Sequence, residues 1–342
     1  MKIKREIAKS SPLSKDTECM AKTADDIKVA ELTVKKTSPR RYKAFGQYMK
    51  ELYNASVYKV NVDAGFTCPN RDGTVATGGC IYCNNDSFRP IACTSTESVR
   101  TQIERGIPYL HSRYGAEKFL VYFQPYSNTY ATVETLERLY REALDNPGVI
   151  GLAIGTRPDC IDEEKIALLA KLARDHFILL EYGLQSIYDK TLAFINRGHD
   201  YRCFKKALSM TVGRGIRIGT HLILGFSTET REEMLGMADE MSNLQVEFLK
   251  IHQLQVIRGT PMAKMFEAKQ FSTFLYQDWI EMLAEFLERL SPDIVLQRLF
   301  AAAPDAILLA PIWNKTRSEL LRDLDVYMEK KSSYQGKQWA SR

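Results

Sequence analysis

The sequence lacks the features of a membrane or a secreted protein. None of its apolar runs reaches eighteen residues, so we expect no transmembrane helix and no membrane partner. The first residues, MKIKREIAKSSPLSKDTE, contain no apolar stretch of the kind found in secretory signals. Internal repeats and low-complexity tracts are also missing. With 45% apolar and 26% charged residues, the composition is that of a globular protein, and we expect a cytoplasmic location.

Cysteine is scarce, and its distribution is uneven. The seven cysteines lie at positions 19, 68, 80, 83, 93, 160 and 203. Their number is odd, no secretion signal is present, and Cys68, Cys80 and Cys83 lie close together. In a reducing cytosol such a group indicates metal ligation or redox chemistry rather than a disulfide framework.

Positive charge is concentrated at the start of the chain. Residues 1–50 hold 13 Lys/Arg and 6 Asp/Glu, whereas residues 51–342 hold 34 and 36. We interpret residues 1–38 as a flexible basic leader, 39–299 as the core and 300–342 as a C-terminal extension. The leader is either an arm that binds nucleic acid through its phosphates or a solvated segment without a partner.

From residue 40 onward, short apolar runs alternate with helical patterns. A helix is expected to end near Asn54. Strands are expected at 57–62, 119–123, 150–155, 177–184, 216–224 and 248–256, and helices at 97–112, 132–145, 162–175, 188–213 and 228–244. A last helix near 274–290 and a tail containing 294–296 are expected to close one side. This order predicts an α/β fold, a partial (β/α)6 parallel barrel with N-terminal and C-terminal extensions, whose ligands lie at the carboxyl ends of the strands.

The three grouped cysteines follow the first strand, in GFTCPNRDGT and GGCIYCNN. Four glycines and a proline allow this loop to bend around a bulky inorganic group. Structural zinc and ordinary electron-transfer clusters use four ligands, whereas three cysteines on a 4Fe–4S cubane leave one iron open for S-adenosylmethionine (SAM). A zinc site completed by Cys93 or His111 is the alternative.

The cysteine loop resembles that of the YhcC-like radical SAM family and, more distantly, the radical SAM domain of the Elongator catalytic subunit. The likeness continues in order through YFQPYSNTYA at 122–131, GTRPDCI at 155–161, LEYGLQS at 180–186, INRGHD at 195–200 and HLILGF at 221–226. It implies a barrel of radical SAM type and an enzyme that holds a 4Fe–4S cluster on Cys68, Cys80 and Cys83. Such an enzyme cleaves SAM reductively to a 5′-deoxyadenosyl radical, which abstracts hydrogen from a substrate. The sequence shows neither an acetyltransferase domain after the core nor a second cysteine cluster, so we expect neither acyl transfer nor sulfur insertion.

The resemblance also implies SAM-binding residues. The polar side chains after the second strand are candidates for the SAM amino group, Arg157 for the SAM carboxylate or a substrate phosphate, and the inward-facing pair on the fourth strand for the ribose. Gly225 would let the chain pass close to adenine. These candidates are Gln124, Ser127, Asn128, Arg157, Glu181, Gln185 and Gly225. The alternatives are a loop that satisfies its own backbone, a salt bridge from Arg157 to Asp159 or Asp162, and a simple turn at Gly225.

The remaining assignments concern histidines and partners. His199 belongs to the INRGHD motif and is interpreted as the cap of the next helix, while His221 and His252 line the substrate cavity or lie satisfied in the core. An electron donor such as flavodoxin or ferredoxin is an expected partner. The substrate is unknown; the basic leader and the Elongator likeness favour RNA. A competing hypothesis is a zinc-stabilised RNA-binding protein, which would be colourless where an iron–sulfur enzyme is brown.

Overall fold

The structure is a computed structural model that describes residues 40–84 and 95–339. The expected leader at 1–38 and Cys93 lie outside the described residues. Within the described part, seven parallel strands form one sheet in the order β1-β2-β3-β4-β5-β6-β8. The strands are β1 (Val57–Val62), β2 (Lys118–Phe123), β3 (Val149–Thr156), β4 (Phe177–Gln185), β5 (Arg217–Leu224), β6 (Phe248–Gln253) and β8 (Val295–Arg298).

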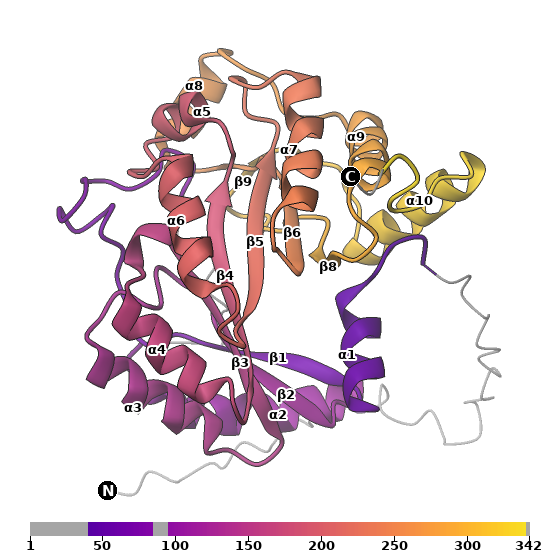
Figure 1. Cartoon of the computed structure of the whole chain (residues 1–342). Helices are drawn as coiled ribbons and strands as arrows, with labels where there is room; N and C mark the ends of the chain where they lie inside the picture. Colours follow the sequence, from indigo (N-terminus) through magenta and orange to yellow (C-terminus); the bar gives the residue numbers. More distant parts are fainter. Residues whose placement is uncertain (1–39, 85–94, 340–342) are drawn as a thin grey trace, which may run out of the picture. The chain divides into compact units, whose positions relative to one another are not determined.

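The expected partial barrel is confirmed, with one correction to its strand count. All six predicted strands are present and pair in chain order, and the sheet curls as Figure 1 shows. The run at 294–296, expected as part of a closing tail, instead forms β8, in which Val295 pairs with Phe248 of β6. This strand is only four residues long, and its pairing depends on the exposed edge of β6 rather than on a local pattern.

The crossover helices follow the predicted pattern except in one segment. α2 (Val99–Tyr114), α3 (Val133–Leu144), α4 (Glu163–Leu172), α7 (Arg231–Asn243) and α9 (Tyr276–Arg289) lie where helices were expected. The single helix predicted at 188–213 is wrong, because the chain forms α5 (Asp189–Phe194) and α6 (Tyr201–Thr211). Between them Asn196 has φ +52° and Gly198 φ +76°, left-handed conformations that no helix accommodates.

The remaining elements lie outside the seven-stranded sheet. They comprise α8 (Pro261–Glu267), α10 (Arg317–Lys330), a 3₁₀ turn at Pro158–Cys160, and a two-stranded antiparallel ribbon of β7 (Val256–Ile257) and β9 (Leu308–Ala310). In the described part of the chain, no helix has both the length and the apolar character needed to cross a membrane.

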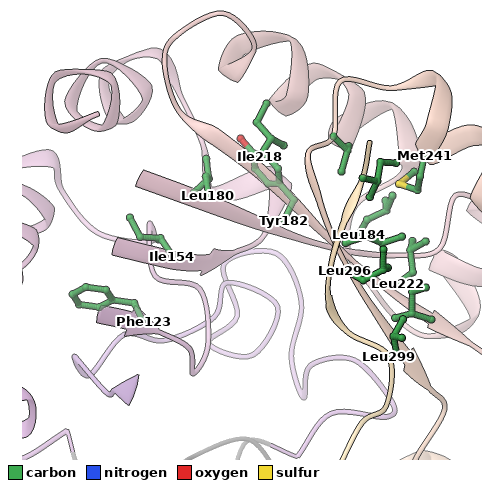
Figure 2. Close-up of a cluster of buried hydrophobic side chains, with 14 of the residues drawn as sticks. Phe123, Ile154, Leu180, Tyr182, Leu184, Ile218, Leu222, Met241, Leu296 and Leu299 are labelled. Atoms are coloured by element: carbon green, nitrogen blue, oxygen red, sulfur yellow. The ribbon is translucent and has the colours of Figure 1, made fainter. Parts of the chain in front are cut away.

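Alternate residues of each strand point to opposite faces of the sheet, and the outer face is apolar. Leu180, Tyr182 and Leu184 of β4 pack beneath the crossover helices, and Figure 2 shows them with neighbours from other strands and from α7. The labelled members of this cluster are Phe123, Ile154, Leu180, Tyr182, Leu184, Ile218, Leu222, Met241, Leu296 and Leu299. Along each strand, the residues that alternate with these outward-facing ones face the inside of the curled sheet.

The inner face is apolar only near the amino ends of the strands. There α1 (Phe45–Tyr53) packs against the sheet, with the rings of Phe45 and Tyr48 5.7 and 5.4 Å from that of Phe248. Met49 on the same helix is completely buried. Asn54, with φ +48°, ends the helix at the predicted residue. Because α1 fills the amino end, the polar inner residues lie toward the carboxyl ends, where ligands are expected.

Candidate functional site

A pocket of about 160 Å³ is lined by inner-face residues and by the cysteine loop that follows β1. It brings together most of the side chains that the sequence nominated, although they come from separate strands and loops. Those that line it are Cys68, Cys80, Cys83, Gln124, Arg157, Glu181 and Gln185. The same pocket is lined by His221 and His252, and His221 Nε2 also lies 3.1 Å from Glu181 Oε2; that the pocket accepts the substrate stays a prediction.

The cysteine loop is held in place by hydrogen bonds to the segment that follows α5. The N–H of Ile81 donates to the carbonyl of Ile195 at 3.0 Å, and the Asn196 side-chain amide donates to the carbonyl of Gly79 at 2.9 Å. At Gly79, with φ +83°, an added Cβ would lie 2.9 Å from the Arg71 side chain. Only glycine fits this bend. The two hydrogen bonds with Ile195 and Asn196, both in the INRGHD segment, fix the position of the cysteine loop.

Each of two cysteine sulfurs has a hydrogen-bond donor. Asn70 Nδ2 and Arg197 Nη1 each lie 3.5 Å from Cys80 Sγ, and Arg71 Nη1 lies 3.8 Å from Cys83 Sγ. Burial, and then repulsion from Cys80, raise the pKa of the Cys83 thiol to about 11, while the two arginines act in the opposite direction. Metal ligation requires thiolates, and the donors and positive charges favour that form.

The geometry of the cysteine end differs from that of a site for one ion. Among the described residues, no three His, Cys, Asp or Glu side chains are placed to hold a single metal ion. The ring of His111, the alternative fourth ligand, lies 3.0 Å from the carbonyl of Ala116 through Nδ1 and does not line the pocket. The thiolates of a cubane need not converge on one point, because each binds a different iron.

Arg157 is held by an ion pair and retains a buried atom without a partner. Its Nε and Nη2 donate to the two carboxylate oxygens of Asp159 at 2.8 and 2.6 Å, which confirms the salt-bridge interpretation. Its Nη1 is buried and has no hydrogen-bond partner in the described part of the chain. A planar guanidinium fixed in this way presents its free edge for a second acceptor.

Three nominated residues lie outside the pocket lining. Ser127 Oγ accepts a hydrogen bond from the backbone N–H of Arg157 at 3.2 Å, and Asn128 Nδ2 donates to the carbonyls of Phe123, Pro125 and Gly155. At Gly225, with φ +110°, an added Cβ would lie 3.0 Å from the ring of Phe274. These contacts fasten the loops after β2 and β5, and a role for the three residues in binding SAM stays a prediction.

A set of buried and half-buried polar residues around the ionised Glu181 crosses the inner face; we call it the charged layer. It consists of Lys59, Tyr122, Glu181, His221 and Lys250, from five different strands. Glu181 Oε1 accepts a hydrogen bond from Lys59 Nζ at 2.8 Å, while Oε2 accepts from Lys250 Nζ and lies 3.1 Å from His221 Nε2. Lys250 Nζ also donates to the Tyr122 hydroxyl at 2.7 Å. The carboxylate that the sequence nominated for the ribose is thus satisfied by protein side chains.

Glycines leave room for this carboxylate. Glu181 pairs with Gly155 on β3 and with Gly219 on β5, and a Cβ at Gly219 would lie 3.3 Å from its Cγ. Burial alone would raise the pKa of Glu181, but Lys250 and Lys59 outweigh it and hold that pKa well below its usual range. Glu181 is therefore ionised.

The histidines of the pocket are neutral at pH 7. Burial lowers the pKa of His221 to about 4 and that of His252 well below its usual value. His199 does not cap α6, contrary to the prediction: Asp200 Oδ1 accepts from the Cys203 N–H at 2.8 Å. Asp200 is the stronger cap because its short carboxylate reaches the third helical N–H.

Sequence reasoning missed the lysines of the charged layer and the neighbouring Arg298. The available signal was a single lysine in each of two otherwise apolar or neutral strands, VYKVNV and FLKIHQ. A lysine inside a barrel needs a partner, but a strand pattern does not reveal which carboxylate it meets.

Two family profiles match this chain. The profile of the radical SAM superfamily matches residues 71–241, and that of a radical SAM C-terminal domain matches residues 246–330. YtqA of Bacillus subtilis (strain 168) is 33% identical over 298 residues, covering 87% of this chain and 92% of its own length. YhcC of Escherichia coli (strain K12) is 33% identical over 299 residues, covering 86% and 96%.

More distant matches cover only part of the other protein. The tRNA uridine(34) acetyltransferase of Methanocaldococcus infernus is 26% identical over 185 residues, which make up 53% of this chain and 34% of that enzyme. The solved structure of Elp3 from the same archaeon, with its N-terminus deleted, superimposes with a TM-score of 0.61 at 20% identity. The superposition covers 82% of this chain and 64% of that one.

Proposed function

The chain belongs to the radical SAM superfamily and to its YhcC-like branch, and from this premise we propose that it cleaves SAM reductively and abstracts a hydrogen atom from a substrate. Members of this superfamily are enzymes whose cofactors are a 4Fe–4S cluster and SAM. The observation that carries the proposal is the pocket into which Cys68, Cys80 and Cys83 bring their thiols together with polar inner-face side chains.

The residues at the cysteine end fit a 4Fe–4S cluster. A cubane held by three thiolates is anionic, and Arg71 and Arg197 supply positive charge and donors at the sulfurs. Buried polar atoms near these cysteines, Asn70 Oδ1 and Arg197 Nε, have no hydrogen-bond partner among the described residues. Such atoms are rare unless a ligand completes them. In our proposal Cys68, Cys80 and Cys83 hold the cluster.

We assign the binding of SAM to the remaining polar residues of the pocket. Gln124, Gln185 and the free Nη1 of Arg157 offer an amide donor, an amide acceptor and a cation to its amino, carboxylate and ribose groups. A reduced 4Fe–4S cluster bound here would supply the one electron that breaks a sulfonium bond of SAM, giving methionine and a 5′-deoxyadenosyl radical. The protein's own part is to orient SAM, to fix the cysteine loop and to exclude water.

The apolar part of the pocket wall supports the proposal that the protein excludes water from the reaction. Tyr82, Tyr126 and Ile223 line it with apolar surface, and burial raises the pKa of Tyr82 well above its usual value. A largely apolar wall keeps water from a reactive intermediate. Cys160, which is buried and has its pKa raised to about 12, stays a protonated thiol and takes no part.

Partners and location are further parts of the proposal. The cluster must be reduced by an external one-electron donor such as flavodoxin or ferredoxin, and a reducing cytoplasm suits it.

For the substrate, RNA is supported by the partial similarity to a tRNA uridine(34) acetyltransferase and by the excess of 7 positive charges in residues 1–50. Deleting residues 1–38 should then weaken RNA binding and flatten its salt dependence without affecting SAM cleavage.

The test is anaerobic reconstitution with iron and sulfide, reduction with dithionite, and detection of 5′-deoxyadenosine. We expect a brown protein with broad absorption near about 400 nm that releases 5′-deoxyadenosine from SAM. The matched control is Cys160→Ala, which should retain both properties because its thiol lies outside the pocket. A fully reconstituted, reduced protein that leaves SAM intact, with or without cell extract, would contradict the proposal.

A further inference from the structure

The charge of the pocket is unbalanced beside the charged layer. Lys250 and Arg298 line the pocket, Lys59 lies in the same layer, and Glu181 is the only carboxylate among the described residues of the lining. Both oxygens of Glu181 already accept hydrogen bonds from Lys59 and Lys250. Burial lowers the pKa of both lysines and Glu181 acts in the opposite direction, so the two lysines share this one carboxylate, and no acidic side chain of the lining remains for Arg298.

Arg298 is the cation that has no carboxylate partner in the described part of the chain. It comes from β8 and is partly buried, and its side chain has neither an ion pair nor a hydrogen bond with any described residue. His252, which lines the same pocket and whose pKa is lowered by burial and then by Arg298, has its Nε2 buried without a hydrogen-bond partner in the described part of the chain. A guanidinium and a nearby imidazole nitrogen, both without partners, make a site for a planar or tetrahedral oxyanion.

The cofactors of the proposed function do not supply this negative charge. SAM carries one carboxylate, which the proposed function assigns to Arg157, and its ammonium and sulfonium groups are positive. The thiolates of the cysteine end have their own cations in Arg71 and Arg197. The excess charge beside Arg298 therefore remains for a third component.

We propose that the substrate carries an oxyanion, a carboxylate or a phosphate, which binds to Arg298 with His252 beside it. This inference rests on the proposed function, since it names a chemical feature of the substrate that the same pocket accepts. Lys250, which donates a hydrogen bond to the Tyr122 hydroxyl, forms the adjoining wall together with that tyrosine. The oxyanion anchors the substrate at one end of the pocket, and its reacting carbon faces the cysteine end.

The experiment titrates inorganic phosphate and acetate, as probes for the two oxyanions, into the anaerobic holoprotein with SAM. Ionic strength is held constant with chloride, and melting temperature is recorded against probe concentration to give a Kd. The variants are Arg298→Gln, Arg298→Lys and, as matched control, Arg138→Gln on α3, whose side chain is 67% exposed. Iron content and SAM affinity are measured on the same samples.

We expect saturable binding of at least one probe to the wild type and to Arg138→Gln. Arg298→Gln should bind that probe about ten- to a hundredfold more weakly, because one charge-assisted contact is lost. Arg298→Lys should lie between the two, since an ammonium keeps the charge and loses the two-pronged geometry. Tighter binding of phosphate identifies a phosphate-bearing substrate, and tighter binding of acetate a carboxylate-bearing one.

Two results overturn the inference: no saturable binding of either probe to the wild type, or equal affinity in the wild type and Arg298→Gln. Failure of the proposed function gives a different result. If the proposed function fails, the wild type lacks iron or does not bind SAM. If the inference fails, the wild type holds iron and binds SAM, but Arg298→Gln does not change its affinity for the oxyanion.

Discussion

The two faces of the sheet are built from the same strands and have opposite character. On β4, Leu180, Tyr182 and Leu184 face outward into an apolar core, while Glu181 faces inward to two lysines and a histidine. Glu181 is as completely buried as these three outward residues. The outer face stabilises the fold by removing apolar area from water, whereas the buried Glu181 on the inner face is stable because Lys59 and Lys250 pair with it.

This difference implies different tolerance to substitution. An outer residue can be replaced by another of similar volume, since apolar packing is not directional. An inner residue belongs to a network whose members come from different strands, so the loss of one leaves another buried and unpaired. The four predictions below test the contrast, from the largest expected effect to the smallest.

The cysteine end should show the largest effect. Cys68→Ala, Cys80→Ala and Cys83→Ala are each expected to abolish cluster assembly, because a cubane with two thiolates exposes a second iron. Iron and sulfide counted per chain after anaerobic reconstitution give the answer. Cys160→Ala and Cys203→Ala, whose sulfurs do not line the pocket, serve as controls and should keep a full complement. Full iron in Cys68→Ala would disprove the three-ligand assignment.

The next effect separates the two faces on one strand. Glu181→Gln should lower the free energy of unfolding by about 3–5 kcal/mol, because Lys59 and Lys250 lose their counter-charge. Leu180→Ala should cost a similar amount, about 2–5 kcal/mol, through a cavity. Denaturant unfolding of the apoprotein measures both.

A second substitution tells the two mechanisms apart. Lys250→Met should restore part of the stability lost in Glu181→Gln, since it removes an unpaired charge, and should restore nothing in Leu180→Ala. If Lys250→Met lowers stability equally in both backgrounds, the inner face is not an ionic network and the contrast between the faces fails.

The third prediction compares the buried carboxyl group of Glu229 with that of Glu181, which two lysines keep ionised. Glu229, in the turn before α7, accepts a hydrogen bond from Ser186 Oγ at 2.5 Å, and its Oε2 is buried without a partner in the described residues. Burial raises its pKa from 4.5 to about 7. The folded protein therefore holds this proton more tightly than the unfolded chain, so stability falls as pH rises from about 4.5 through 7.

Glu229→Gln removes this dependence. Relative to the wild type it should gain stability with rising pH, by up to about 3 kcal/mol at about pH 8, and no such gain should appear below about pH 4.5. Denaturant unfolding across this range measures the difference. A difference that stays constant with pH would show that Glu229 is ionised in the folded protein, as Glu181 is.

The smallest expected effect concerns Arg157. Arg157→Gln should retain the cluster and weaken SAM binding about ten- to a hundredfold, or about 1.5–3 kcal/mol, because one charge-assisted contact is lost. Asp159→Asn is the informative companion, since it loosens the guanidinium without removing it and should weaken binding less. Anaerobic titration of both variants with SAM decides; equal affinity in the wild type and Arg157→Gln would assign Arg157 a structural role.

The parts of this protein that the sequence predicted correctly are local. Strands and crossover helices were visible as alternating apolar runs, and the end of α1 at Asn54 followed from its apolar periodicity. The INRGHD segment shows the limit of this approach. Helical periodicity ran through it, and only the left-handed Asn196 and Gly198, which carry the cysteine loop's supporting contacts, divide α5 from α6.

The sequence by itself determined the parallel α/β architecture, the cysteine loop after the first strand and the radical SAM family. Only the tertiary structure decided which polar residues meet inside the curl, that β8 extends the sheet, and that Arg298 lacks a counter-ion. Glu181 meets Lys59 and Lys250 across 122 and 69 residues of chain, and Lys59 meets Gln297 across 238. Such contacts depend on the register of several strands at once, and no local pattern of residues encodes that register.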